Sequence, residues 1–324
     1  MNPSSSWLKV EELLGGSRPA FTGDANDMRS QLIGLSKSLA PLFPPESNGV
    51  VTKDGTYEGI RYRVYTPSII NDATIGKLPC GVYFHGGGFV LGDLDMDDPI
   101  CRALCEGTHA VIISVGYRLA PEHKAPTQLR DSLEFFEWVY HSAKNLGTCQ
   151  EKLFTIGTSA GGALAFTVAR KVALGHASLP KNAAKGVVAF NPVTVHPDNI
   201  PKYCMSQHTS FEENKENTPI LNLKTLLEFF TLTQISPNDS DYFVGLDQES
   251  HGLLPPSYIV TCEWDPLRDD GKVLADSMEL LGVNVKRDHW NGMPHCFWLF
   301  PMVPEYTEFM EMAYKGFKWV IEQA

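Results

Sequence analysis

The sequence predicts an α/β protein with a doubly wound, mainly parallel sheet. Two observations carry this prediction. Short strand-like runs alternate with helical patterns along most of the 324 residues, and the middle runs are apolar without alternation. A strand with one face in water shows a polar residue at every second position, whereas a strand covered on both faces does not. The central strands are therefore expected to lie between two layers of helices.

The expected strands and helices follow each other in a regular order. Seven strands are predicted, at Ile60–Tyr65, Cys80–Phe84, Ala110–Val115, Leu153–Ile156, Val187–Phe190, Ser257–Cys262 and Val283–Asp288. The helix before the strand at 153 carries apolar residues at helical spacing, and so does a later helix that ends at Gly282. The last helix is expected at about residues 305–322.

Two segments do not fit this alternation. Residues 1–47 have a helical pattern and precede the first predicted strand. Residues 196–252 form a long insertion that contains a helical stretch at 221–232. Long insertions without strands are typical of lids and binding segments. We expect one α/β domain over residues 1–324, with a cap over the strand ends built from about 1–47 and 196–252.

Composition excludes several classes of protein. The 27 Lys and Arg residues are outnumbered by 38 Asp and Glu residues, so the net charge of -11 disfavours nucleic acid as a partner. No apolar stretch approaches the roughly 18 residues that a membrane span needs. The seven cysteines lack paired CxxC spacing, so no structural zinc site is expected. No secretory signal is recognised at the N-terminus, and a cytoplasmic location is expected.

The strongest motif is Gly157-Thr158-Ser159-Ala160-Gly161, a G-x-S-x-G between a predicted strand and a predicted helix. This setting produces a sharp turn that exposes the serine hydroxyl at the strand end, with a helix N-terminus behind it. An ordinary Gly/Ser turn is the alternative. The strand–turn–helix setting favours Ser159 as a nucleophile, with the N–H of Ala160 as a donor to an oxyanion.

A second motif, His85-Gly86-Gly87-Gly88-Phe89, follows the strand at 80–84. Consecutive glycines leave backbone N–H groups unshielded, so that they can point at one oxygen atom. Such an arrangement stabilises the oxyanion that forms when a nucleophile attacks an ester carbonyl. A flexible glycine-rich loop is the alternative interpretation.

A nucleophilic serine needs a base, and in this fold type the acid and then the histidine follow the serine in the chain. His295 lies in a Gly/Pro loop after the last predicted strand and is the expected base. His289 ends that strand and is expected to be structural or surface-facing. Three further histidines fall in the insertion, where solvated side chains are expected and pocket lining is the alternative: His196, His208 and His251.

The acid that orients the base is expected just past the strand at 257–262. Asp265 is the preferred candidate because of its position in that loop, and Glu263 is its nearest competitor. Asp269 and Asp270 begin the next helix, where the helix dipole favours carboxylates, so capping is expected to explain them.

Five motifs occur in an order that resembles the hormone-sensitive-lipase-type carboxylesterases of the α/β-hydrolase fold. They are His85–Phe89, Tyr117–His123, Gly157–Gly162, Asp265–Asp269 and Pro294–Phe297, within a resemblance that covers roughly residues 50–322. The resemblance implies an eight-stranded, mainly parallel sheet with helices on both faces and a helical cap. It also implies a catalytic triad of Ser159, Asp265 and His295, with oxyanion donors at Gly87, Gly88 and Ala160, and no cofactor or metal.

The chain departs from this family at two positions near the nucleophile. Thr158 stands where the family usually has Asp, which changes the charge beside Ser159. Asp97 stands where the family often has His, and this position is expected to shape the loop. The motif at 117–123 is expected to support turn and core geometry and not to take part in the chemistry.

The sequence therefore predicts a serine carboxylesterase that hydrolyses acyl esters of small to medium molecules, and it resembles fungal esterases of secondary metabolism. A lactonase, a thioesterase, or an acyl-transferring or cyclising enzyme with the same triad is the alternative. A non-catalytic ligand receptor is disfavoured because His295 is present, whereas the related plant gibberellin receptors have lost it. The aromatic residues outside the core strands either line a pocket or, as we expect, pack the cap: Trp7, Phe211, Phe229, Phe230, Tyr242 and Phe243.

Overall fold

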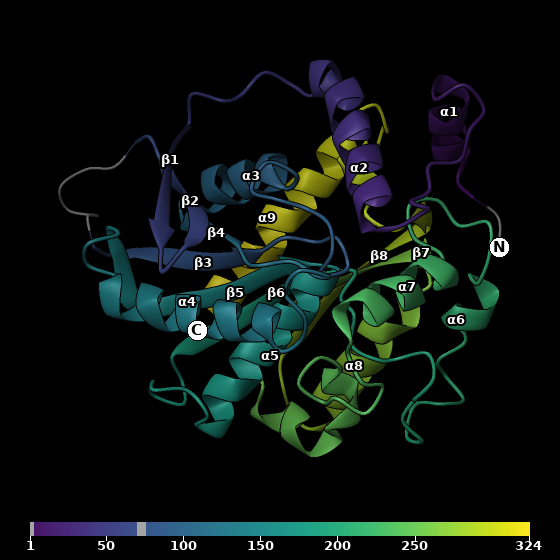
Figure 1. Cartoon of the computed structure of the whole chain (residues 1–324). Coiled ribbons are helices and arrows are strands. Elements are labelled where there is room, and N and C mark those ends of the chain that lie inside the picture. Colours follow the sequence, from purple (N-terminus) through teal and green to yellow (C-terminus); the bar gives the residue numbers. More distant parts are fainter. Residues whose placement is uncertain (1–2, 70–75) are drawn as a thin grey trace.

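The computed structural model describes residues 3–69 and 76–324, and Figure 1 shows its arrangement around one central sheet. The strands are β1 (Val50–Tyr57), β2 (Ile60–Pro67), β3 (Leu78–Phe84), β4 (Val111–Gly116), β5 (Thr148–Thr158), β6 (Ala184–Phe190), β7 (Ser257–Trp264) and β8 (Val285–Pro294). Their order across the sheet is β1-β2-β4-β3-β5-β6-β7-β8. β1 and β2 pair antiparallel with each other, as do β2 and β4, and the remaining pairs are parallel.

The helices lie on both faces of the sheet (Figure 1). They are α1 (Ser5–Leu13), α2 (Ala25–Leu39), α3 (Asp98–Thr108), α4 (Thr127–Ser142), α5 (Ala160–Leu174), α6 (Ser210–Glu213), α7 (Leu223–Thr233), α8 (Arg268–Leu280) and α9 (Tyr306–Glu322), with 3-10 turns at Ala40–Leu42, Val244–Leu246, Gln248–Leu253 and Phe297–Leu299. α3 and α9 cover one face, and α4, α5 and α8 cover the other. The α/β-hydrolase architecture and the eight-stranded sheet are confirmed.

The two buried faces explain the unbroken apolar runs of the middle strands. Successive residues of β4 illustrate the point, because Ile112 packs into the core beneath α3 and α9, whereas Ile113 packs into the core beneath α4 and α5. On the first face, the ring of Trp298 stacks on Phe309 with centroids 4.1 Å apart. A polar residue at either position of β4 would be buried, so both positions are apolar.

The sequence did not predict β1, and it ended β8 too early. Residues 50–57 contain Lys, Asp and Gly and form an edge strand with partly exposed side chains, so they lack the apolar run of a central strand. β8 continues through Pro294, six residues beyond its predicted end, because a polar and Gly-containing stretch still pairs with β7.

Residues 1–47 and 196–252 contact each other across the carboxyl ends of the strands. The Ile220 N–H donates to the carbonyl of Pro19 at 2.6 Å, and Ala20 forms a parallel bridge with Ile220. The Thr225 hydroxyl lies 3.3 Å from the carbonyl oxygen of Phe21. The two segments thus meet, while the single-domain assignment and the cap stay predictions.

Three expectations about the insertion were wrong. His196, His208 and His251 are buried, not solvated. His251 contacts the Ser277 hydroxyl at 2.8 Å, and His208 contacts the Asp270 carboxylate at 2.8 Å. His208 and His251 thus attach the insertion to α8, whereas His196 packs against Phe230 and Phe243 within the insertion. Residue type and position in a polar segment do not reveal these contacts.

Capping does not explain the two acids that begin α8. Both carboxylates point at the chain between β6 and α6. The backbone N–H groups of Thr194 and Val195 donate to Asp270, and burial raises the pKa of this carboxyl. The N–H groups of residues 209 and 210 donate to Asp269 at 2.8 Å each. The acids satisfy backbone groups of another segment, not the N-terminus of their own helix.

Two further sequence features have plain structural counterparts. All seven cysteines are free thiols, and six of them are buried in the manner of small apolar side chains. Among residues 3–69 and 76–324, no helix combines the length and the apolar character needed to cross a bilayer. The cytoplasmic location stays a prediction.

Candidate active site

Ser159 occupies the sharp turn between β5 and α5. Its backbone has φ 55° and ψ -118°, an uncommon conformation for a residue with a side chain, and its N–H donates to the Phe190 carbonyl at 2.8 Å. The glycines of the motif allow close approach of the backbone. A Cβ atom on Gly161 would lie 1.9 Å from the carbonyl oxygen of Phe84. The G-x-S-x-G pattern therefore reflects the packing of α5 against the ends of β3 and β5.

The structure brings Ser159, His295 and Asp265 into one hydrogen-bonded chain. The His295 Nε2 atom lies 3.0 Å from the Ser159 hydroxyl oxygen, and its Nδ1 atom lies 2.7 Å from Asp265 Oδ2. All three side chains are buried. Because a carboxylate only accepts, Nδ1 donates to it and leaves Nε2 free to accept the serine proton. His289 contacts the Thr261 hydroxyl instead.

Asp265, and not its competitor Glu263, faces the base. The Glu263 carboxylate accepts the Gly292 N–H at 2.6 Å, outside the serine–histidine chain. The Asp265 carboxylate accepts the Leu267 N–H at 2.8 Å through Oδ1 and the Asn191 side-chain amide through Oδ2. Both oxygens of the acid are therefore held by donors.

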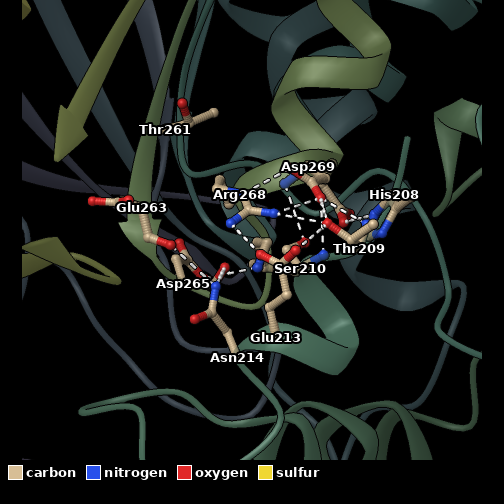
Figure 2. Close-up of polar contacts among 12 residues, drawn as sticks. His208, Thr209, Ser210, Glu213, Asn214, Thr261, Glu263, Asp265, Arg268 and Asp269 are labelled. Atoms are coloured by element: carbon tan, nitrogen blue, oxygen red, sulfur yellow. Dashed lines mark hydrogen bonds and ion pairs between the residues drawn. The ribbon is translucent and has the colours of Figure 1, made fainter. Parts of the chain in front are cut away.

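Sequence reasoning missed Asn191. The signal was present, because Asn191 and a following proline end β6 at the same edge of the sheet as the nucleophile. Its φ of 48° is tolerated better by Asn than by most residues with a side chain. Figure 2 shows another unpredicted contact, in which Asn214 of the insertion points toward the backbone at Asp265.

The glycine loop after β3 lies beside Ser159. The N–H groups of Val90 and Leu91 donate to the Gly87 carbonyl, at 3.1 and 2.8 Å, which curls the loop. A Cβ atom on Gly88 would lie 2.1 Å from the ring of Phe229, so only glycine fits beneath this residue of the insertion. The role of the loop as an oxyanion hole stays a prediction.

His85 and Tyr117 support the loop from below. Their rings stack with centroids 4.2 Å apart, and the Tyr117 hydroxyl donates to the His85 carbonyl at 2.8 Å. Burial lowers the pKa of His85 to about 4, so the ring is neutral near pH 7. Its Nδ1 atom donates to the carbonyl of Gly86 at 2.8 Å. These contacts agree with a supporting role for the 117–123 motif.

Asp97 contacts the same loop from the start of α3. Its Oδ2 atom accepts the Gly86 N–H at 3.1 Å, whereas Oδ1 is buried without a hydrogen-bond partner among the described residues. Burial raises the pKa of Asp97 to about 6. Nearby, the hydroxyls of Tyr83 and Thr158 are 2.7 Å apart. The two departures from the family pattern thus lie in one buried polar region under the nucleophile.

A cavity of about 210 Å³, here called the chamber, opens onto Ser159 and His295. The glycine loop forms one wall. Much of the rest is apolar and comes from the two non-alternating segments: Phe21, Leu32 and Leu35 from the first, and Ile220, Leu221 and Phe229 from the second. Of the aromatic residues considered in the sequence, Phe229 lines the chamber, while the others are buried in packing contacts.

A larger cavity of about 1070 Å³ adjoins the chamber. It lies between α2, α3 and the β1–β2 pair and contains both acidic and basic side chains. Four half-buried side chains line both cavities and separate them: Leu32, Leu35, Met96 and Leu299. Among residues 3–69 and 76–324, no cluster of three or more His, Cys, Asp and Glu side chains has the arrangement of a metal site.

Comparisons with known proteins agree with this geometry. The model of a family described as alpha/beta hydrolase fold matches residues 81–299. Versiconal hemiacetal acetate esterase of Dothistroma septosporum is 38% identical over 320 residues, which cover 99% of this chain and 95% of that protein. Carboxylesterase NlhH of Mycobacterium tuberculosis is 33% identical over 268 residues, covering 76% and 75%. The crystal structure of vibralactone cyclase has a TM-score of 0.86 at 26% identity, covering 99% and 95%.

The substitution Asp97→Asn is expected to stabilise the protein at pH 8 but not near pH 4. The folded state holds the Asp97 proton up to about pH 6, whereas an unfolded carboxyl loses it near pH 4, so stability falls as pH rises between these values. Asn stays neutral and still offers an oxygen to Gly86. We expect a gain of about 1–3 kcal/mol at pH 8 from urea unfolding.

The control is Glu228→Gln, which removes an exposed acid from α7 and should change stability little at either pH. A gain of equal size at pH 4 and pH 8 would show that the effect at position 97 does not come from ionisation.

Proposed function

Because the chain belongs to the hormone-sensitive-lipase-type carboxylesterases of the α/β-hydrolase fold and is a serine ester hydrolase, we propose that Ser159, His295 and Asp265 form its catalytic triad. The observation that carries this assignment is the buried chain of hydrogen bonds from Ser159 through His295 to Asp265, at 3.0 and 2.7 Å. The serine in this chain sits on a strained turn ahead of a helix, as the nucleophile of this fold requires.

The reaction follows from the protonation states of these side chains. His295 takes the hydroxyl proton as the Ser159 oxygen attacks the ester carbonyl, and Asp265 stabilises the imidazolium that forms. His295 then gives the proton to the leaving alcohol, which breaks the C–O bond and leaves an acyl-enzyme. Water loses a proton to His295 as it attacks the acyl carbonyl, and the acid is released with the serine restored.

The negative charge that develops on the carbonyl oxygen needs donors. We assign this role to the N–H groups of Gly87, Gly88 and Ala160, which lie on the two turns beside the nucleophile. One such donor is typically worth about 3 kcal/mol of transition-state stabilisation. The contacts that Asp97 and His85 make with Gly86 support this assignment, because they limit movement of the loop.

Residues of about 1–47 and 196–252 act, in this proposal, as a cap on a single catalytic domain of residues 1–324. Their apolar side chains line the chamber and limit the access of water to the ester. An apolar chamber of about 210 Å³ suits an uncharged ester with a short acyl group. The relative in Dothistroma is named for an acetate ester, which supports a substrate with a short acyl group.

A cyclising reaction is the second candidate, since the structure resembles vibralactone cyclase over 99% of the chain. An acyl-enzyme protected from water can pass its acyl group to an internal nucleophile. Hydrolysis is expected to dominate when p-nitrophenyl acetate is supplied with a tenfold excess of an alcohol over the ester. Mass spectrometry of the products measures the split, and a majority of transferred acetyl groups would favour the second candidate.

A fluorophosphonate is expected to add once to the wild-type protein and not at all to the Ser159→Ala variant. The reagent reports an activated serine without any knowledge of the substrate. Intact-mass analysis counts the adducts, and peptide mapping locates them. A folded wild-type protein that gains no adduct would exclude the proposed triad.

Asp265→Asn is expected to lower kcat about 10⁴-fold, as loss of the orienting carboxylate does in other serine triads. Glu263→Gln is the matched control, because the two acids stand two residues apart and Glu263 faces Gly292 rather than His295. Its kcat should stay within about threefold of wild type in a steady-state assay with p-nitrophenyl acetate. Equal losses in both variants would contradict the assignment of the acid.

A further inference from the structure

We propose that Asn191 and Asn214 are positioning residues for Asp265, so that the insertion helps to build the triad as well as to cover it. The inference rests on the proposed function, because it assumes that Asp265 orients His295. Asn191 acts on the carboxylate itself, and Asn214 acts on the backbone that carries it. The two contacts reach different parts of the acid and have different consequences.

Asn191 is fully buried at the end of β6, next to the nucleophile turn. Its amide nitrogen donates to Asp265 Oδ2, the same oxygen that accepts from His295. Its amide oxygen faces the Cys262 thiol at 3.6 Å, and its backbone N–H donates to the Val260 carbonyl at 2.8 Å. Both ends of the side chain are therefore occupied, which fixes the orientation of the amide.

The backbone of Asn191 is strained, since its φ of 48° is uncommon for a residue with a side chain. Strained residues persist where the surroundings determine them, and they cluster at functional sites. Two donors on one oxygen of Asp265 hold the carboxylate plane toward His295. They also spread its negative charge, which limits how strongly the acid favours the imidazolium.

Asn214 belongs to the insertion and follows α6. Its amide nitrogen donates to the carbonyls of Glu263 and Asp265, at 3.1 and 2.9 Å, and so spans the turn that carries the acid (Figure 2). The side chain is buried, and its own oxygen has no hydrogen-bond partner among the described residues. The hydrogen bonds of the Asn214 amide therefore go to the turn that carries Asp265 and not to other parts of the insertion.

Neighbouring contacts hold α6 to the same turn. The Ser210 hydroxyl donates to the Pro266 carbonyl at 2.7 Å, and the Arg268 guanidinium pairs with Glu213 at 2.8 Å. Asp269 accepts two backbone N–H groups of the insertion, and although burial opposes it, Arg268 holds the pKa of this acid at about 2. Figure 2 shows these groups converging on one side of Asp265.

The insertion therefore has two contacts with the site. A few residues beyond Asn214, the Thr218 hydroxyl donates to the carbonyl of Leu221 at 2.7 Å, and Leu221 lines the chamber. The Thr218 hydroxyl also lies 3.4 Å from the Asn214 carbonyl. The same short segment thus contacts the acid turn at one end and the substrate chamber at the other.

Three other titratable groups near Asp265 and His295 could affect the pH–rate profile. They are the Cys262 thiol from β7, the Cys296 thiol after β8 and the Asp97 carboxyl before α3. Burial raises the pKa of both thiols well above the usual range, so they stay neutral in the assay. Burial raises the pKa of Asp97 to about 6, and its carboxylate accepts from Gly86 and contacts neither asparagine, so comparison with the wild type and with the control allows for its titration.

The test compares pH–rate profiles of kcat/KM for p-nitrophenyl acetate. Asn191→Gly removes the amide and keeps a residue that accepts positive φ, and Asn191→Leu removes the amide while keeping a side chain of similar size. Both should lower kcat about 10- to 100-fold and move the acid limb up by about half a pH unit or more. The reason is that an Asp265 with fewer donors holds the protonated form of His295 more strongly.

Asn214→Ala should lower kcat about tenfold without moving the acid limb, because Asn214 contacts only the backbone of the turn. Asn199→Ala is the matched control, an asparagine of the insertion whose amide contacts Pro237 and Asn238. It should behave as wild type. Thermal unfolding checks each variant, and Asn191→Leu, which keeps a side chain of similar size, carries the test at that position if the glycine variant does not fold.

The outcomes distinguish the proposed triad from the positioning roles of Asn191 and Asn214. Fluorophosphonate labelling of the wild type together with an unmoved acid limb in both variants of residue 191 would overturn the role of Asn191 and leave the triad standing. An Asn214→Ala variant no slower than Asn199→Ala would overturn the role of Asn214. A wild type that is not labelled would overturn the proposed function and this inference with it.

Discussion

Trp264 ends β7 and pairs with Pro294, which ends β8, so Asp265 and His295 are the first residues after the two strands. The pairing of β7 with β8 therefore brings the side chains of Asp265 and His295 within 2.7 Å of each other. β5 ends one residue before Ser159 at the same edge of the sheet. A slip of one residue between neighbouring strands turns every side chain to the opposite face, so strand register is the constraint on which the rest of the site depends.

Local patterns in the sequence were sufficient for the turn at Ser159 and for the glycine loop, because each depends on residues that are adjacent in the chain. Three features were not predictable in this way. The edge strand at 50–57 lacks an apolar run, and the amide of Asn191 gains its role only when β6 and β7 lie side by side. The His208–Asp270 contact joins residues 62 positions apart, and neither residue stands in a motif that indicates the other.

Three buried carboxyl groups near the site differ in the hydrogen-bond donors that surround them. Asp265 accepts hydrogen bonds from a histidine, an amide and a backbone N–H, and Asp270 accepts from His208 and two backbone N–H groups. Asp97 has one backbone donor, from Gly86, and burial raises the pKa of its carboxyl to about 6. Burial raises the pKa of Asp270 as well as that of Asp97, although three donors surround the Asp270 carboxylate.

The bridge between Ala20 and Ile220 has a consequence for folding during synthesis on the ribosome. Its two halves lie about 200 residues apart in the chain. At about 5–20 residues per second, a ribosome takes roughly 10–40 s to deliver the second half after the first. Throughout that interval the apolar side chains of Leu32 and Leu35 have no chamber to line. Until the insertion has been synthesised, these side chains therefore lack the contacts across the chamber that they have in the folded protein.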